Sequence, residues 1–224
     1  MNVEAKPHPA GLHKTILAFG DSLTWGLDPR ARDRHRFENR WTTILERQLP
    51  NTRVIPEGLS GRTTSFDDQG GTACRNGADI LPVLLGSHYP LDLVIIMLGT
   101  NDLKPHICGT AIGAATGMER LATIAALFPY EYDYQPPRLL IVSPPHFRNG
   151  ADGPPIGGRS IAESKLLAPL YRQVAERRNC GFFDAADCAT ASSVDGVHLD
   201  ASNTRAIGIG LVPVVQALLY PEAA

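Results

Sequence analysis

A serine at the end of an apolar run is the first residue whose position suggests chemistry. Ser22 stands in Gly20-Asp21-Ser22-Leu23, directly after Ile16–Phe19. A serine at a strand-to-helix turn projects its hydroxyl at the carboxyl edge of a sheet, where open α/β folds bind ligands. The N–H groups of the helix that follows would suit an oxyanion. Asp-Ser before a helix is also ordinary capping chemistry, so the motif alone does not establish a nucleophile.

A carboxylate and an imidazole stand three residues apart near the end of the chain, as Asp195 and His198. At this spacing the carboxylate can reach the Nδ1 side of the ring and fix its tautomer. Nε2 is then free to take a proton from a serine, as in a Ser-His-Asp triad. A lone Asp-x-x-His is a weak signal, because histidine is also a common cap or core residue. Other histidines have no comparable partner in the sequence: His8, His13, His35 and His88.

Two further motifs offer hydrogen-bond donors for an oxyanion. Gly61, within Gly58–Thr64, can present its backbone N–H at close range because it has no side chain. Asn101, within Gly99–Asp102, can donate its side-chain amide to a developing negative charge. Each motif is also an ordinary turn or cap signature. The first is not a phosphate-binding loop, because it lacks the GxxxxGK[ST] spacing.

Alternative chemistries fit the sequence less well. Asp21 would be the nucleophile of an aspartyl-phosphate site, but such sites usually place a second carboxylate two residues on, where this chain has Leu23. No HExxH or other metal-ligand spacing occurs, so we expect neither a metal nor a cofactor. The cysteines form no CxxC pair and are expected to be small buried thiols: Cys74, Cys108, Cys180 and Cys188.

The composition excludes several classes of protein. With 43% hydrophobic and 20% charged residues, the 224-residue chain is typical of a globular protein. Lys and Arg number 21 against 23 Asp and Glu, a balance that argues against a nucleic-acid partner. The longest apolar run, Leu93–Leu98, is far shorter than the ~20 residues that cross a bilayer. Met1–Lys14 has no apolar signal-peptide core, which indicates a cytoplasmic location and no membrane partner.

Short apolar runs alternate with amphipathic stretches along the chain. The expected strands are Thr15–Gly20, Arg53–Glu57, Asp92–Leu98, Arg138–Ser143 and Gly181–Asp184. The expected helices are Trp41–Leu49, Asn76–Gly86, Thr110–Phe128, Ile161–Arg178 and Ser202–Leu219, with Pro169 and Pro213 expected to kink or restart the last two. This alternation predicts a three-layer α/β fold. We expect a single domain over residues 1–224, with residues 1–14 as a loosely ordered extension.

Two stretches are expected to be long loops. Asp28–Glu38 is dense in charge and is interpreted as a solvated surface loop. Pro144–Gly158 is rich in proline and glycine, and a loop of this length inside a compact domain often covers a site. The four motifs follow different predicted strands of one sheet and therefore meet at its carboxyl edge. Together they supply a nucleophile, a base, a carboxylate that orients the base and two further donors, which are the groups that an acyl-transfer reaction needs.

This ordered set resembles the SGNH branch of the GDSL esterases and lipases, and the resemblance spans almost the whole chain, from Ile16 to His198. The resemblance implies a flavodoxin-like fold with a five-stranded parallel sheet. It also implies roles for individual residues. Ser22 is expected to be the nucleophile, with Asp195 and His198 completing the triad. Gly61, Asn101 and the backbone N–H of Ser22 are expected to form the oxyanion hole.

Within this family the chain is most similar to the arylesterase/acyltransferase group, through FGDSLTWG, RWT, EGLSGRTT, LDLVIIMLGTND and VSPP. Members of that group tend to be homo-oligomers whose loops restrict the site entrance. The resemblance therefore implies a homo-oligomeric serine esterase that hydrolyses short-chain acyl esters of aryl or small alkyl alcohols through a covalent acyl-enzyme. Acyl transfer to alcohols or peroxide is a further expected activity. The expected substrate pocket includes Asp21, Trp25, Thr100 and His146. A carbohydrate acetylesterase is the alternative, and a non-catalytic binding module ranks last.

Overall fold

The computed structural model describes residues 13–220 and contains one five-stranded parallel sheet. Its strands are β1 (Lys14–Gly20), β4 (Thr52–Gly58), β5 (Leu93–Met97), β6 (Arg138–Ser143) and β7 (Gly181–Asp184). Their order, β4-β1-β5-β6-β7, is that of a flavodoxin-like sheet. The predicted fold class and all five predicted strands are confirmed. Lys14 already pairs in β1, while residues 1–12 of the expected extension lie outside the described residues.

The inner strands are buried because both faces of the sheet are covered. All five residues of β5 are buried, which explains its unbroken apolar sequence. Along β1, alternate side chains point to opposite faces. Leu17 and Phe19 belong to the core on one face, and Ile16 and Ala18 belong to the core on the other.

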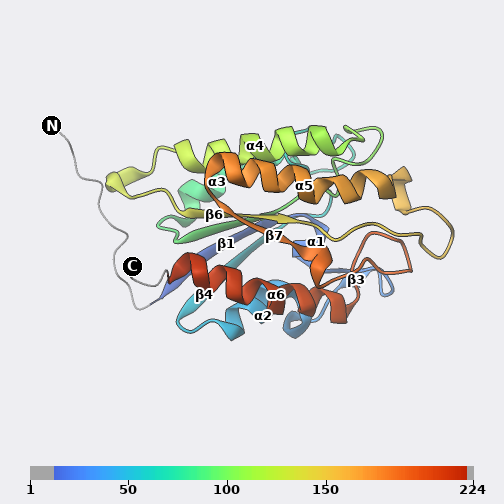
Figure 1. Cartoon of the computed structure of the whole chain (residues 1–224), viewed down its shortest axis with the longest axis horizontal. Coiled ribbons are helices and arrows are strands. Elements are labelled where there is room, and N and C mark those ends of the chain that lie inside the picture. Colours follow the sequence, from blue (N-terminus) through green and yellow to red (C-terminus); the bar gives the residue numbers. More distant parts are fainter. Residues whose placement is uncertain (1–12, 221–224) are drawn as a thin grey trace.

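Three helices cover one face and two cover the other (Figure 1). The first group is α3 (Gly77–His88), α4 (Ala111–Leu127) and α5 (Ile161–Arg178), and the second is α2 (Trp41–Gln48) and α6 (Ala201–Leu219). Polar side chains cap the starts of four of them: Asn76, Thr110, Ser160 and Asp200. No helix within residues 13–220 combines the length and the apolar composition that a membrane span requires.

The interior prolines were expected to kink or restart their helices, and neither helix restarts. Pro169 lies inside α5 and Pro213 inside α6, and both helices are continuous. Both prolines are exposed. The carbonyl groups that lose a helical partner at an exposed proline can be solvated, while the buried faces of both helices remain packed on the sheet.

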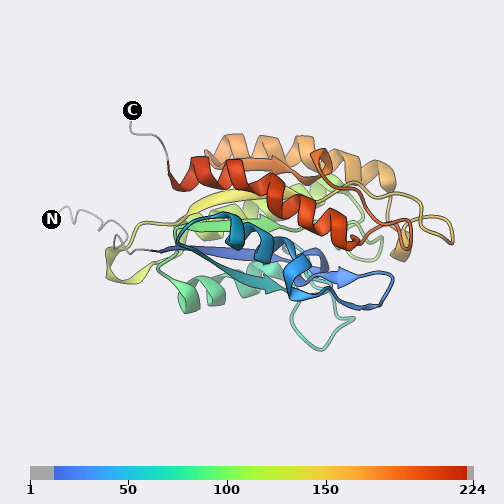
Figure 2. The same cartoon turned by 90° about the horizontal axis from the view of Figure 1, so that it is seen from below.

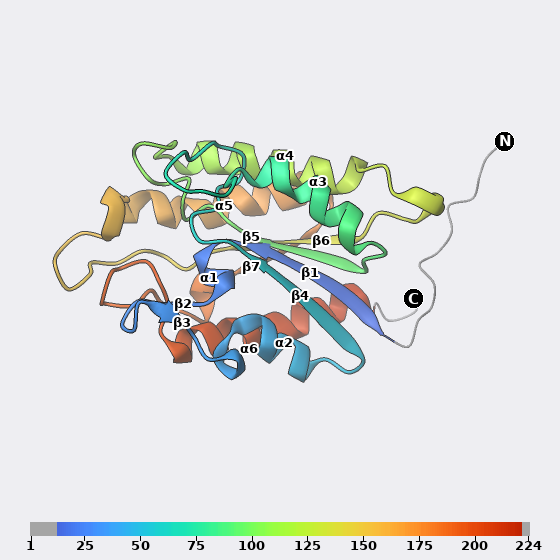
Figure 3. The same cartoon turned by 180° about the vertical axis from the view of Figure 1, so that it is seen from behind.

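The charged stretch after the serine motif is not simply an irregular loop. It contains an antiparallel pair, β2 (Leu27–Asp28) and β3 (Asp33–Arg34), followed by a 3-10 turn at Phe37–Asn39. Figure 3 shows this hairpin beside the one-turn helix α1 (Ser22–Trp25). Two-residue strands and a single 3-10 turn are too short to show a hydrophobic period in the sequence, which is why they were not predicted.

All four motif segments emerge at one end of the sheet, because the strands are parallel. The long segment after β6 crosses the same end, as Figures 1 and 2 show, and contains one 3-10 turn at Ile156–Gly158. Further 3-10 turns lie at Glu131–Asp133 and Ala185–Asp187. The fold thus brings residues from five parts of the chain to one edge.

Candidate active site

The serine is held at the start of α1 by its neighbours. The Oδ1 atom of Asp21 accepts a hydrogen bond from the Leu23 N–H at 2.9 Å and so caps the helix. Gly20 must lack a side chain, since a Cβ there would lie 2.0 Å from the Thr24 hydroxyl oxygen. The helix that the sequence places after the serine has only four residues, so it provides a single capped turn.

Ser22, His198 and Asp195 form a continuous chain of hydrogen bonds. The Ser22 Oγ atom lies 3.0 Å from His198 Nε2, and His198 Nδ1 lies 2.6 Å from Asp195 Oδ2. An ionised carboxylate can only accept, so the ring proton must be on Nδ1. Nε2 is then an acceptor that faces the serine hydroxyl. The structure thus brings together the three residues that the sequence assigned to a triad.

The carboxylate of Asp195 is kept ionised by its hydrogen bonds. Burial on its own would raise the pKa of Asp195, but the His198 ring and the backbone N–H groups of Val197 and His198 outweigh this effect and lower it. Both backbone bonds reach Oδ1 at 2.9 Å. One oxygen therefore anchors the turn while the other orients the imidazole.

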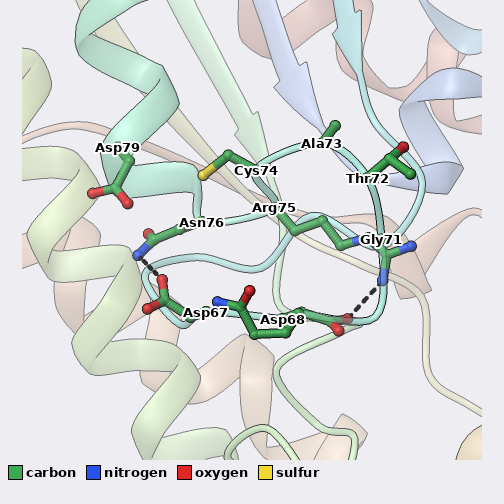
Figure 4. A pocket seen from close by; sticks show the side chains of 10 residues that line it. Asp67, Asp68, Gly71, Thr72, Ala73, Cys74, Arg75, Asn76 and Asp79 are labelled. Carbon is green, nitrogen blue, oxygen red and sulfur yellow. Dashed lines mark hydrogen bonds and ion pairs between the residues drawn. The ribbon is translucent and has the colours of Figure 1, made fainter.

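Gly61 occupies a backbone conformation that favours glycine, with φ +89°. A Cβ there would lie 2.6 Å from the Arg75 Nε atom. Arg75 is itself fixed by an ion pair with Asp68 at 3.0 Å, which Figure 4 shows across a polar hollow of about 320 Å³. Lys104 binds the same Asp68 oxygen at 3.1 Å. Ion pairs therefore help to hold the segment that packs against Gly61.

The side-chain amide of Asn101 has a defined orientation. Its Oδ1 atom accepts a hydrogen bond from Arg159 Nη2 at 3.0 Å, and its Nδ2 atom donates to the Arg62 carbonyl at 3.0 Å. An arginine can only donate and a carbonyl can only accept, so the two neighbours agree on which amide atom is nitrogen. The same Nδ2 lies 3.4 Å from Asp21 Oδ2, at the long limit of a hydrogen bond.

The comparison with protein families decides what this arrangement belongs to. The model of the GDSL-like lipase/acylhydrolase family matches residues 18–205. The chain belongs to that family. The resemblance that the motifs indicated is thereby confirmed, and this family member carries its serine, glycine, asparagine and histidine motifs at one sheet edge.

Several solved structures are similar to this GDSL-like chain. A protein from Agrobacterium tumefaciens assigned as an arylesterase is 55% identical, with a TM-score of 0.90, over 92% of this chain and 100% of its own. A carbohydrate acetylesterase family member from Sinorhizobium meliloti is 47% identical, with a TM-score of 0.88, over 92% and 99%. The aryl esterase of M. smegmatis is 39% identical, with a TM-score of 0.86, over 92% and 100%. No curated protein matches the chain.

The asparagine and glycine motifs of this family member are joined by a buried carboxylate that sequence reasoning left unused. Asp102 accepts hydrogen bonds from the Thr64 N–H, at 3.0 and 3.1 Å to its two oxygens, and from the Thr64 hydroxyl. Burial raises the pKa of Asp102 to about 6, against the lowering effect of these bonds. The pair fixes the segment after Gly61 relative to the segment that carries Asn101.

The expected substrate-pocket residues occupy different environments. Asp21 and Thr100 are buried, with exposed fractions of 0% and 1%, and their place in the substrate pocket stays a prediction. Burial also raises the pKa of Asp21. Trp25 is partly exposed, with the Arg34 guanidinium 5.2 Å from its ring centroid, and remains a candidate pocket wall. His146 interacts electrostatically with Asp184, at the end of β7.

Two arginines are important to the site and were not found from the sequence. Arg62 donates through Nη1 to the carbonyl groups of Gly20, at 2.8 Å, and Glu57, and it lies over the Phe19 ring. Arg159 is buried beside Asn101. An arginine in a loop has no local sequence signature, and only the fold shows what its guanidinium contacts.

Two further histidines have structural partners away from the triad. The His35 Nε2 atom binds the Leu199 carbonyl at 2.9 Å, and its Nδ1 atom lies 3.6 Å from Asp28. His88 pairs with Glu57 at 3.0 Å. The cysteines are unpaired, but Cys74 is exposed and the other three are half-buried, so the expectation of buried thiols was wrong. Among the described residues, no cluster of three or more His, Cys, Asp or Glu side chains could hold a metal ion.

Proposed function

We propose that this chain is a serine esterase that hydrolyses short-chain aryl or small alkyl esters through a covalent acyl-enzyme. The observation that carries the proposal is the hydrogen-bond chain from Asp195 through His198 to Ser22, with contacts of 2.6 and 3.0 Å. At these distances a base can take a serine proton and a carboxylate can orient the base. Similarity to the arylesterase structures supports the same activity.

The reaction follows from the proton positions. His198 Nε2 accepts the hydroxyl proton of Ser22 while Oγ attacks the ester carbonyl carbon. The imidazolium that forms is stabilised by Asp195. Collapse of the tetrahedral intermediate breaks the bond to the alkoxy oxygen, which leaves as the alcohol after taking the proton from Nε2. Water then adds to the acyl-enzyme by the same steps, releasing the acid and restoring the serine.

In this proposal the oxyanion is stabilised by three donors: the backbone N–H groups of Ser22 and Gly61 and the side-chain amide of Asn101. The Asn101 Nδ2 atom has one short bond, to the Arg62 carbonyl, and one long contact, to Asp21. The long contact is the one that an oxyanion would replace. Such an exchange favours the transition state, in which the substrate oxygen carries more charge than in the ester.

The test combines turnover with labelling. A series of p-nitrophenyl esters of increasing acyl length should be hydrolysed fastest at the short end, and a fluorophosphonate should label Ser22. Turnover that survives complete labelling of Ser22 would reject the assigned nucleophile. If the protein shows no turnover and no labelling, the result favours a non-catalytic binding module.

A carbohydrate acetylesterase is the second candidate, supported by the 47% identity to the Sinorhizobium meliloti protein of that class. The same triad would serve it, because only the alcohol differs. Acetylated sugars assayed beside p-nitrophenyl acetate decide between the two. A higher kcat/KM for the sugars favours this candidate, and the reverse favours the aryl and alkyl esters.

We also propose that the acyl-enzyme can pass its acyl group to alcohols or peroxide. Vinyl acetate supplied with a primary alcohol in buffer tests this, since transfer product above the mole fraction of the alcohol requires a site that favours the alcohol over water. Product at or below that fraction indicates ordinary hydrolysis. The homo-oligomer and the cytoplasmic location stay predictions from the sequence.

A further inference from the structure

Arg159 lies where the segment after β6 ends and is among the few charged residues buried within residues 13–220, with an exposed fraction of 7%. Its guanidinium makes three different contacts. Nε donates to the Thr100 carbonyl at 2.8 Å, and Nη2 donates to Asn101 Oδ1 at 3.0 Å. Nη1 donates to the Ile156 carbonyl at 2.7 Å. One planar group therefore holds both the backbone and the side chain of the asparagine motif.

The segment that carries Arg159 also holds the turn that contains Asp195. The Ile156 N–H donates to the Asp195 carbonyl at 2.9 Å, and the Arg148 N–H donates to the Gly196 carbonyl at 3.1 Å. A third bond joins the Ala151 N–H to the Val194 carbonyl at 3.2 Å. A chain of contacts thus runs from Asp195 through Ile156 and Arg159 to Asn101.

We infer that Arg159 is a positioning residue for the oxyanion hole, which orients the Asn101 amide so that its N–H, and not its oxygen, faces the reacting carbonyl. The inference rests on the proposed role of Asn101 as an oxyanion donor. A flipped amide would place its oxygen against the oxyanion and repel it. The flip is prevented on one side by the Arg62 carbonyl and on the other by the Arg159 guanidinium.

The charge of Arg159 strengthens this effect. Hydrogen bonds to a charged donor are stronger than those between neutral groups, and in a buried site they polarise the groups they join. A cation on Oδ1 draws electron density from the amide and makes its N–H a better donor. Burial lowers the pKa of Arg159, while the nearby carboxylates of Asp21 and Asp195 oppose that effect and help keep it protonated.

The first experiment measures kcat and KM separately for Arg159→Met and Arg159→Lys with p-nitrophenyl acetate. Arg159→Met should lower kcat about tenfold to 10²-fold, less than the 10²–10³-fold expected for loss of an oxyanion donor itself, with KM nearly unchanged. Arg159→Lys keeps the charge without the planar fork, so its kcat should be intermediate. If Arg159→Met does not fold, Arg159→Lys carries the test. A rise in KM at unchanged kcat would overturn the inference.

The second experiment repeats both substitutions in an Asn101→Ala background. A residue that acts through Asn101 has nothing left to position, so the further loss of kcat should be under about twofold. A residue that only maintains the fold should lower kcat by the same factor in both backgrounds, and this result would overturn the inference. If Asn101→Ala alone leaves kcat unchanged, it is the proposed oxyanion hole that fails.

A matched control separates stability from catalysis. Tyr171→Phe removes the buried hydrogen bond that the Tyr171 hydroxyl donates to the Leu98 carbonyl at 3.0 Å. Leu98 follows β5, the strand that also leads to Asn101. Tyr171→Phe should lower the unfolding temperature and leave kcat near that of the parent. A fall in kcat equal to that of Arg159→Met would show that general loosening of this edge explains both, which contradicts the inference.

Discussion

His198 is bonded to Asp195 twice, through its ring at 2.6 Å and through its own backbone N–H at 2.9 Å. The ring bond uses Oδ2. The backbone bond uses Oδ1, which the Val197 N–H shares. The two oxygens of one carboxylate thus have different tasks, since one shapes the turn and the other sets the tautomer of the base.

Asp195→Asn should therefore abolish most of the activity while keeping the turn. The amide oxygen must take the place of Oδ1, because two backbone N–H groups require an acceptor there. The amide NH₂ then faces Nδ1 and forces the ring proton onto Nε2. A protonated Nε2 can no longer accept the Ser22 proton. In the Ser-His-Asp template of the serine proteases this substitution lowers kcat by ~10⁴, and we expect a loss of that order. Steady-state turnover beside thermal unfolding checks it, and near-parental turnover would remove Asp195 from the triad.

Ser22→Ala should abolish turnover and fluorophosphonate labelling without loss of stability. The change removes a single oxygen whose described side-chain partner is His198 Nε2, so no large cavity remains. Ser87→Ala is the matched control, because Ser87 is exposed on α3 and bonds only its own helix through the Val83 carbonyl at 2.7 Å. Turnover by Ser22→Ala within tenfold of the Ser87→Ala control would reject the nucleophile.

Asn101→Ala should lower kcat by ~10²–10³, or roughly 2.7–4 kcal/mol of transition-state stabilisation. The KM should change little, since the amide acts on charge that develops after binding. Initial rates over a range of substrate concentration separate the two constants. A higher KM at constant kcat would make Asn101 a binding residue instead.

The strands and the main helices were predictable because each has its own local signal. Buried parallel strands are continuous apolar runs, as in β5, and α5 was predicted with its observed bounds. The triad and the oxyanion donors could be proposed because each follows a strand, and parallel strands end at one edge. The role of each residue was implied by the resemblance to the GDSL esterases and lipases.

The supporting contacts could not be predicted, because they join segments that are far apart in sequence. Arg159 and Asn101 are 58 residues apart, and Thr64 and Asp102 are 38 apart. Nothing in the residues around Arg159 distinguishes it from a surface arginine. Asp21 illustrates a local contact: its side chain caps α1 by accepting from the Leu23 N–H two residues on, as Asp-Ser before a helix indicates.

Asp102→Asn should change how stability depends on pH. The pKa of Asp102 is raised from 3.8 to about 6, so between these values the folded protein keeps a proton that the unfolded chain has lost. The Asp102 contribution is therefore greatest below pH ~4 and is lost as the pH rises through ~6, by about 3 kcal/mol in all.

Asparagine does not titrate, so the stability of the variant relative to the parent should increase from pH 4 to pH 7. Urea unfolding of both proteins across this window measures that difference, in which the other carboxylates cancel. A difference that is constant with pH would mean that Asp102 ionises as it does in the unfolded chain.

Gly196→Ala should damage both stability and catalysis, because the turn between Asp195 and His198 has no space for a side chain. Gly196 has φ +76°, and a Cβ there would lie 2.1 Å from the Arg148 carbonyl oxygen. Gly109→Ala is a close control: its φ is +75°, but its Cβ would meet nothing nearer than 3.5 Å. Both variants bear the dihedral strain, about 1–3 kcal/mol. Only Gly196→Ala must also push the segment after β6 away from Asp195. Its unfolding temperature should therefore fall further than that of Gly109→Ala, and its kcat should fall while that of Gly109→Ala should not. Equal kcat values for the two variants would show that the site tolerates movement of this segment.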